Sequence, residues 1–221
     1  MSSSLQLTVF VIFLYCQVNH LSNGFYALRT AYKNGNIMLG GLFDLHESVG
    51  VNGSCGDLLA ANLGSIEAMI FAIESINQNH SLLPNVTLGY DIRDYCLRPA
   101  KAVETAYELV VKSDSRFSLQ NCTRSDGYIA PDMLKEITGV VGPMDSASAV
   151  MVSSLFDVAH IPSVSPLATS VELSSNLYAH FYRTIAPDNW RASLLADMAH
   201  FFNWTYVAAV ALDDSFGRYG I

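Results

Sequence analysis

Three polar residues carry the chemistry that this sequence offers, and each lies where a helix or a tight turn is predicted to start: Ser146, Thr169 and Asp188. Ser146 belongs to the stretch VVGPMDSASAVMV, in which an apolar run stops at Gly142–Pro143 and a hydroxyl-rich helix follows. The first turn of a helix has unpaired N–H donors and the positive end of the helix dipole, so it suits an anion such as a carboxylate. The alternative is that Ser146 only caps its own helix.

The stretch LATS, from Leu167 to Ser170, repeats this pattern, because an apolar strand ends and small hydroxyl residues follow. Two such turns at one edge of a sheet could hold one carboxylate between them. Asp188 follows Pro187 and precedes a predicted helix, so it is either the N-cap of that helix or a partner for an ammonium group.

The last turn, DDSFGRYG, offers an aromatic ring and two carboxylates. Phe216 stands where a turn is expected to be polar, so it is either a packing anchor or a ring face for a cation. Asp213 and Asp214 are either solvated surface charges or ligands of a divalent cation such as Ca²⁺.

The elements that must position these residues alternate along the chain. Apolar runs predict strands over residues 36–46, 86–95, 137–142, 161–166, 181–186 and 204–211, while helical spacing or capping signals predict helices over residues 66–77, 99–111, 146–158 and 189–202. Residues 53–64 are predicted to form a loop, and a second, polar loop is predicted between Lys112 and Glu136. This alternation is typical of an α/β fold with a parallel sheet and helices on both faces. Ligands bind such sheets beyond the carboxyl ends of the strands, where Ser146 and Thr169 are expected.

The net charge of −8 argues against a nucleic-acid partner. Other features of the sequence indicate a secreted chain. Residues 5–16 form an apolar run too short to span a bilayer, which predicts a signal peptide over residues 1–24. The alternative is a buried N-terminal strand. Five N-glycosylation sequons also favour secretion; they begin at Asn52, Asn79, Asn85, Asn121 and Asn203.

The motifs of common enzymes are not found in the sequence. GxSxG, GxGxxG, the P-loop pattern, CxxC and metal-binding His/Cys spacings are all absent. Beyond the predicted signal, the chain has the odd number of three cysteines, which suggests one internal disulfide and one thiol that pairs with another chain. We therefore expect a binding protein without a cofactor rather than an enzyme.

Seven stretches resemble the extracellular ligand-binding domain of class C G-protein-coupled receptors. They occur in the same order as in that family, from about Tyr26 to Ile221. These stretches are GNIMLGGLFDLHE, IEAMIFAIESIN, LLPNVTLGYDIRDYC, VVGPMDSASAV, IPSVSPLATSVELS, FYRTIAPD and FFNWTYVAAVALDDSFGRYGI. Some resemble the calcium-sensing branch and others the metabotropic glutamate branch. The resemblance implies a periplasmic-binding-protein-like (type I) fold of two lobes that close on an amino acid.

For individual residues, the resemblance implies that Ser146 and the backbone of Leu167, Ala168 and Thr169 hold the ligand carboxylate. It implies that Asp188 and Phe216 receive the ammonium group. Glutamate-selective members have a basic residue where this chain has Ser65, so a neutral amino acid is expected. The last-turn aromatic, Phe216, is usually Tyr in the family.

The resemblance also implies covalent and quaternary structure. It implies a Cys55–Cys96 disulfide, with Cys122 bridging two subunits of a homo- or heterodimer at the cell membrane. The dimer contact would lie on lobe one and include Leu155, Val158 and Ala159, for which ordinary core packing is the alternative.

The family's clamshell is about twice as long as this chain and precedes a cysteine-rich module and seven membrane helices, through which the receptors reach a G protein. We therefore expect a receptor fragment with part of lobe one over residues 25–184 and the start of lobe two over residues 185–221. Expressed as it stands, this fragment would be secreted. The alternative function is a secreted or periplasmic-type solute-binding protein without a signalling domain.

Overall fold

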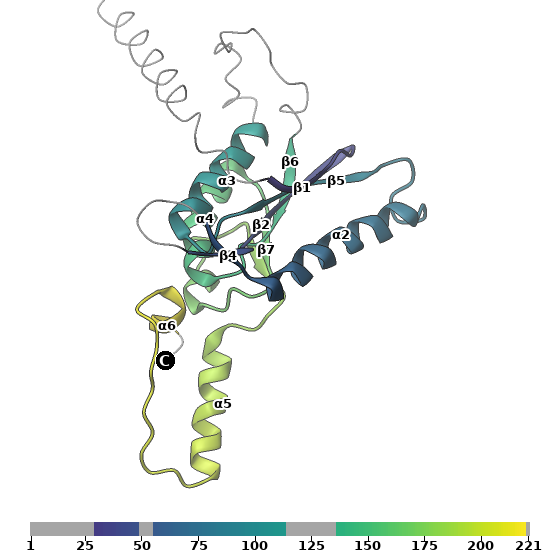
Figure 1. Ribbon diagram of the computed structural model, residues 1–221. Helices are drawn as coiled ribbons and strands as arrows, with labels where there is room; N and C mark the ends of the chain where they lie inside the picture. The colour runs from purple at the N-terminus through teal and green to yellow at the C-terminus, as the bar shows by residue number, and fades with distance from the viewer. Residues whose placement is uncertain (1–28, 49–54, 114–135, 220–221) are drawn as a thin grey trace, which may run out of the picture.

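The computed structural model describes residues 29–48, 55–113 and 136–219 (Figure 1). The predicted signal peptide, the polar loop, Asn52, Asn121 and Cys122 lie outside these ranges. The strands are β1 (Arg29–Lys33), β2 (Ile37–Phe43), β3 (His46–Ser48), β4 (Cys55–Leu58), β5 (Leu88–Asp94), β6 (Ile137–Val141), β7 (Ser163–Ser165) and β8 (Phe181–Arg183). The helices are α2 (Leu63–Gln78), α3 (Pro99–Ser113), α4 (Ser146–Ala159), α5 (Asp188–Phe201) and α6 (Ser215–Tyr219), with short 3₁₀ turns η1 (Ala60–Asn62) and η3 (Val171–Ser174).

Six strands form one mixed sheet in the order β1-β5-β2-β6-β7-β8. All neighbouring pairs are parallel except β1 and β5, which are antiparallel. The predicted α/β fold is therefore confirmed, and the carboxyl ends of β2, β5, β6, β7 and β8 share one edge of the sheet. Strand β1 was not predicted, and its antiparallel direction adds an edge strand beside β5.

Helices cover both faces of this sheet (Figure 1). Helix α2 buries Ile66, Met69 and Ile73 against apolar side chains of β5 on one face. Helices α3 and α4 pack against each other on the opposite face, where Leu109 and Phe156 meet residues of β2 and β6. The buried positions recur at helical spacing because only one stripe of each helix faces the sheet.

Gly142 shows how tightly strand β6 turns toward α4. Its φ is +102°, a conformation that favours glycine. A Cβ atom at this position would lie 2.1 Å from the carbonyl oxygen of Leu42. The turn that leads to Ser146 therefore requires a residue without a side chain.

Two predictions of local structure are wrong. Residues 53–64 do not form a simple loop, because β4 pairs with β3 in a separate two-stranded antiparallel sheet before α2 begins at Leu63. Residues 204–211 are not a strand, and their side chains are exposed. No strand of the described ranges lies beside them, so their backbone groups have no ladder partner.

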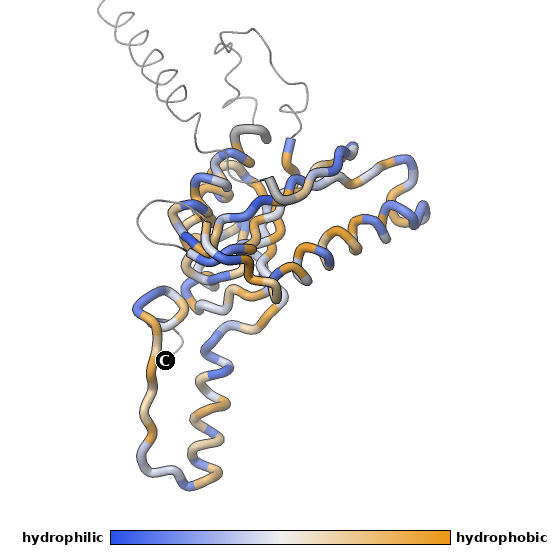
Figure 2. The backbone as a smooth tube through the Cα atoms, in the orientation of Figure 1, coloured by the Kyte–Doolittle hydropathy of each residue, from blue (hydrophilic) through white to orange (hydrophobic). Residues whose placement is uncertain are grey.

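Helix α5 extends away from the sheet, and the chain returns along residues 204–212 as a largely apolar segment (Figures 1 and 2). Large apolar side chains on this unit are exposed, among them Trp190, Phe201, Tyr206 and Val210. The six-stranded sheet with α2, α3 and α4 thus contains the core, whereas α5 and residues 204–212 extend away from it, and α6 comes back to contact α4 and η3.

Candidate ligand-binding site

Ser146 is buried at the start of α4, but it is not the helix cap. The cap is Asp145, whose Oδ1 accepts a 2.8 Å hydrogen bond from the backbone N–H of Ser148. The interpretation of Ser146 as the cap is therefore wrong. Its Oγ atom instead accepts hydrogen bonds from the N–H groups of Thr169 and Ser170, each at 3.1 Å.

The turn after β7 is held on two sides by serine side chains. Ser165 Oγ donates to the carbonyl of Pro143 at 2.5 Å and accepts from the N–H of Ala168 at 3.0 Å. The N–H groups of Ala168 and Thr169 are thus occupied by protein oxygens. A carboxylate at residues 167–169 would therefore meet the hydroxyl groups of this turn rather than the N–H groups of Ala168 and Thr169. The side chain of Leu167 is exposed.

Asp188 lies against the same turn, because its N–H donates to the carbonyl of Thr169 at 2.9 Å. The N-cap of α5 is Pro187, and Asp188 is the first helical residue, so the N-cap interpretation of Asp188 is wrong. Its side chain is 2% exposed, yet neither carboxylate oxygen accepts a hydrogen bond from any residue that the structure describes. Among the described residues, Asp188 forms an ion pair with Arg191, in which Oδ1 lies 3.3 Å from Nη1.

These contacts bring three of the predicted residues together from three segments of the chain. The hydroxyl of Thr169 is buried without a partner, and the proton of the Ser146 hydroxyl has no acceptor among the described residues. The N–H groups of Ser146 and Ala147 have no carbonyl partner within α4, because they belong to its first turn. Hydrogen-bond donors therefore lie beside an under-satisfied carboxylate, an arrangement complementary to a zwitterion.

Phe216 belongs to the short helix α6, which lies beside α4 and η3. The ring is partly exposed, and no hydrogen bond, ion pair or ring contact joins it to Ser146, Thr169 or Asp188. Asp213 forms an ion pair with Arg218 at 2.8 Å, and Arg218 lowers the pKa of this carboxyl through a hydrogen bond and its charge. Asp214 accepts a 2.8 Å hydrogen bond from the N–H of Gly217. Both carboxylates thus have partners within the turn.

An acidic cluster next to Ser146 was missed by the sequence analysis. Asp44 follows β2 and Asp145 follows β6, while Tyr95 donates a 2.8 Å hydrogen bond to Oδ2 of Asp145. Burial, helped by the charges of Asp145 and Asp94, raises the pKa of Asp44 to about 6. Burial and the charges of Asp145 and Asp44 raise the pKa of Tyr95 well above its usual value. The signal available was that Asp44 directly follows strand β2 and Asp145 lies in the short turn between β6 and α4.

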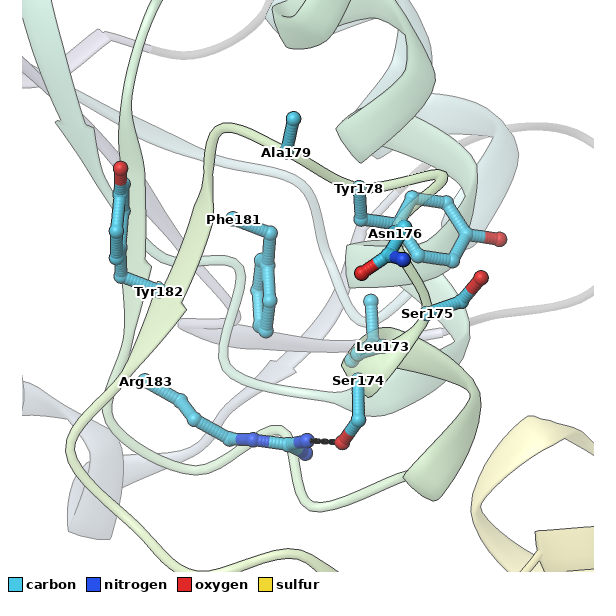
Figure 3. A pocket seen from close by; sticks show the side chains of 9 residues that line it. All are labelled: Leu173, Ser174, Ser175, Asn176, Tyr178, Ala179, Phe181, Tyr182 and Arg183. Carbon is cyan, nitrogen blue, oxygen red and sulfur yellow. Dashed lines mark hydrogen bonds between the residues drawn. The ribbon is translucent and has the colours of Figure 1, made fainter.

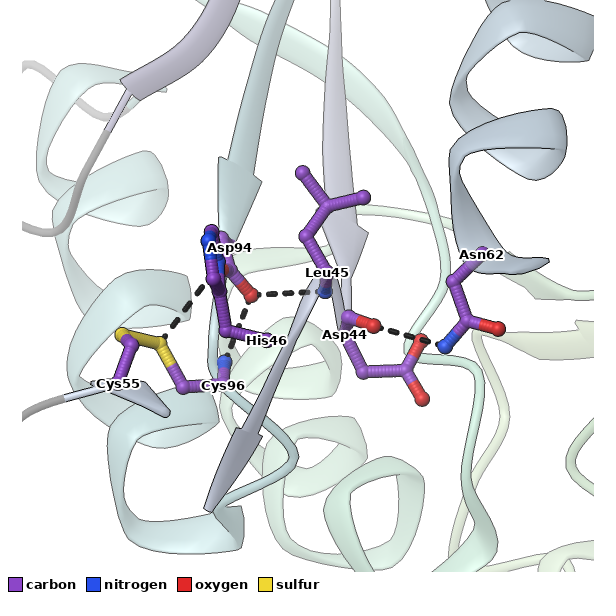
Figure 4. Close-up of polar contacts among 7 residues, drawn as sticks. All are labelled: Asp44, Leu45, His46, Cys55, Asn62, Asp94 and Cys96. Atoms are coloured by element: carbon purple, nitrogen blue, oxygen red, sulfur yellow. Dashed lines mark hydrogen bonds and ion pairs between the residues drawn. A yellow bond between two sulfur atoms is a disulfide. The ribbon is translucent and has the colours of Figure 1, made fainter. Parts of the chain in front are cut away.

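Asp94, the last residue of β5, contacts three neighbouring residues at the carboxyl edge of the sheet (Figure 4). Its Oδ1 accepts from the N–H groups of Leu45 and Cys96, at 2.9 and 2.8 Å, and Oδ2 lies 2.5 Å from Nδ1 of His46. Cys96 forms a disulfide with Cys55, the pairing that the resemblance implies. Cys55, Asp94 and Cys96 are the one group of three close metal-ligating side chains in the described ranges, but both sulfurs belong to the disulfide.

A hollow of about 580 Å³ lies between η3 and β8 (Figure 3). Its lining includes Phe181, Tyr182 and Arg183 but none of the predicted site residues. The guanidinium of Arg183 donates to the carbonyl of Ser170 at 2.9 Å and also to Ser174 Oγ. Burial lowers the pKa of Arg183, and the charge of Asp188 opposes this effect. Arg183 therefore supports the 169–170 turn from the side of the hollow.

Three of the predicted sequon asparagines lie in described ranges, and all three are exposed: Asn79, Asn85 and Asn203. Asn79 Oδ1 accepts a 2.6 Å hydrogen bond from the hydroxyl of Ser81, the third residue of its sequon. Within the described ranges, no helix is both long and apolar enough to cross a membrane.

The chain matches a known protein family over most of its length. Residues 65–221, well over half of the chain, match the family model described as "Receptor family ligand binding region". The matched range contains Ser146, Thr169, Asp188 and Phe216, together with the sheet edge that carries them.

Proposed function

The chain belongs to the family of receptor ligand-binding regions, and from this premise we propose that it binds a free amino acid as part of a class C G-protein-coupled receptor. The family supports an extracellular ligand-binding domain and is generally non-enzymatic. The identity of the ligand and the receptor class are the two parts that go beyond the family match.

One observation carries the proposal: Asp188 and Thr169 bring to one turn a carboxylate and a hydroxyl that have no hydrogen-bond partner in the described part of the chain. A buried carboxylate without a hydrogen bond is costly, and a ligand ammonium group would remove that cost. The hydroxyl groups of Ser146 and Thr169 and the first turn of α4 supply donors for an α-carboxylate. Phe216 would add a ring face for the ammonium group.

A neutral side chain fits this site better than an acidic one. Ser65, in the first turn of α2, offers no positive charge. The carboxylates of Asp44 and Asp145 already lie at this edge, so a further negative charge would be repelled. We therefore propose that the ligand is a neutral amino acid rather than glutamate.

The remaining expectations extend the same proposal. Residues 1–24 would be removed as a signal peptide, residues 25–184 would form lobe one, and residues 185–221 would begin lobe two. The receptor would lie at the cell membrane as a homo- or heterodimer bridged by Cys122, with its ligand domain outside the cell. Ca²⁺ would act as a co-regulator, with Asp213 and Asp214 as candidate ligands.

Saturation-transfer NMR tests the ligand class, because it detects weak binding. We expect purified chain to transfer saturation to leucine but not to leucinamide, which lacks the carboxylate, or to N-acetyl-leucine, which lacks the ammonium group. Equal transfer to all three compounds would rule out recognition of a zwitterion. Stronger transfer to glutamate than to leucine would overturn the preference for a neutral side chain.

A further inference from the structure

Two histidines lie together at the edge of the sheet opposite the ligand site. His160 follows α4 and precedes β7, while His180 directly precedes β8. Both strands are parallel members of the sheet, so both histidines lie near its amino edge. The N–H of Ser163 donates to the carbonyl of His180 at 2.9 Å, which ties the two segments to each other.

The two imidazole rings are close, with ring centres 5.4 Å apart and planes inclined by 63°. Two imidazoles that share one tetrahedral zinc ion place their ring centres about 5 Å apart, given Zn–N bonds of about 2 Å. The observed separation of 5.4 Å is therefore close to that of two imidazoles bound to one metal ion.

Asp157 orients one of these rings. Its Oδ1 lies 2.8 Å from Nδ1 of His180 and also accepts the N–H of His180 at 2.7 Å. An ionised carboxylate can only accept, so Nδ1 carries the proton and the lone pair of the neutral ring is on Nε2. A carboxylate that holds one ring nitrogen and leaves the other for the metal is the usual environment of a metal-binding histidine.

The remaining ring nitrogens of the two histidines are available to a metal ion. Neither Nε2 of His180 nor either ring nitrogen of His160 has a hydrogen-bond partner among the described residues, and the side chain of His180 is 33% exposed. His160 also ends α4 with a φ of 56°, where glycine or asparagine is common.

We propose that His160 and His180 bind one Zn²⁺ ion, with Asp157 as the carboxylate that orients His180 and with water completing the coordination. Imidazole nitrogens are suitable ligands for zinc. This site shares no residue with the proposed amino-acid site.

Calorimetric titration of the purified full chain with ZnCl₂ tests the proposal. We expect one saturable site, with affinity lowered at least tenfold by His160→Gln and by His180→Gln. Asp157→Asn should lower the affinity by about ten- to a hundredfold, as for other residues that orient metal-binding histidines. His80→Gln, at an exposed histidine in the turn after α2, should leave the affinity unchanged.

Two outcomes would overturn the site: no zinc binding by the unaltered chain, or unchanged affinity in either His160→Gln or His180→Gln. Thermal unfolding in EDTA checks that each variant is folded. Should a variant fail to fold, histidine modification of the unaltered chain by diethyl pyrocarbonate, read by mass spectrometry, decides instead. Zinc should protect His160 and His180 but not His80, and equal modification with and without zinc would contradict the proposal.

Discussion

The Oγ atom of Ser146 accepts the backbone N–H of Thr169 at 3.1 Å, across 23 residues of sequence. This bond ties the start of α4 to the turn after β7, and Asp188 joins them through its N–H bond to the carbonyl of Thr169. The candidate site is therefore cross-linked by its own polar groups before any ligand arrives. A ligand would meet a positioned set of donors and one carboxylate, which reduces the ordering cost of binding.

Replacing Ser146 by alanine should lower both stability and affinity. The change leaves the buried N–H groups of Thr169 and Ser170 without an acceptor, which should cost about 1–3 kcal/mol in the free energy of unfolding. Loss of the hydroxyl donor should weaken amino-acid binding roughly ten- to a hundredfold. Denaturant unfolding and ligand titration measure the two effects.

Ser153→Ala is the matched control for this change. Ser153 is a buried serine of the same helix whose hydroxyl donates to the carbonyl of Ala149, one turn earlier. It should leave ligand affinity unchanged. Equal affinity losses in the two variants would mean that Ser146 acts only through the packing of α4.

Replacing Asp188 by asparagine should separate function from stability. The carboxylate is buried and accepts no hydrogen bond from the described residues, so removing its charge should offset the loss of the exposed Arg191 ion pair and leave the free energy of unfolding about unchanged. Binding of an amino acid should fall at least tenfold, because the ammonium group loses its counter-charge. Thermal unfolding and NMR titration of the variant check both expectations. A destabilised variant with unchanged affinity would show that Asp188 is structural.

Much of this site could be predicted because parallel strands place their carboxyl ends at one edge. Ser146, Thr169 and Asp188 each follow a strand, so topology alone brings their segments together. The direction of each side chain could not be predicted. Whether Ser146 caps α4 or contacts the 169–170 turn depends on Asp145, which occupies the cap position one residue earlier.

Two features depend on tertiary contacts that a local pattern does not contain. The apolar composition of residues 204–211 favours a strand, but a strand forms only when a neighbour supplies its hydrogen bonds, and no strand lies beside this segment in the described ranges. His160 and His180 are twenty positions apart and form no local motif, so only the pairing of β7 with β8 brings them together.

Val158 provides a test of the proposed dimer surface on α4. Its side chain is 67% exposed and lies seven residues after Met151, on the same exposed face of the helix. Leu155 and Ala159 are instead partly buried against the core, which supports ordinary core packing for these two residues. Val158→Asp should therefore weaken self-association in sedimentation without loss of stability, whereas Leu155→Asp should mainly destabilise the fold.

Phe71→Asp is the control for Val158→Asp, because Phe71 is an exposed apolar residue of α2 on the other face of the sheet. It should leave the sedimentation profile unchanged. An unchanged profile for Val158→Asp as well would remove this face of α4 from the proposed interface.

Asp44 should make the stability of the chain fall as pH rises from about 4 to 7. Burial and the charges of Asp145 and Asp94 raise its pKa to about 6 in the folded state, from 3.8 for an unperturbed aspartate. Between these values the folded chain keeps a proton that the unfolded chain has lost, so stability decreases with increasing pH. The contribution is complete below pH 3.8, is lost as pH passes 6, and should amount to on the order of 2 kcal/mol.

Denaturant unfolding of Asp44→Asn at several pH values isolates this contribution. Because asparagine does not titrate, the variant should gain stability relative to the unaltered chain by on the order of 2 kcal/mol between pH 4 and pH 7. Asp57→Asn, at an exposed carboxylate of β4, should show no comparable gain. A difference between Asp44→Asn and the unaltered chain that stays constant over this range would mean that Asp44 is ionised throughout. Below pH 6, the acidic cluster beside Ser146 would then keep a negative charge that a raised pKa of Asp44 would remove, and it would repel an acidic ligand there as well.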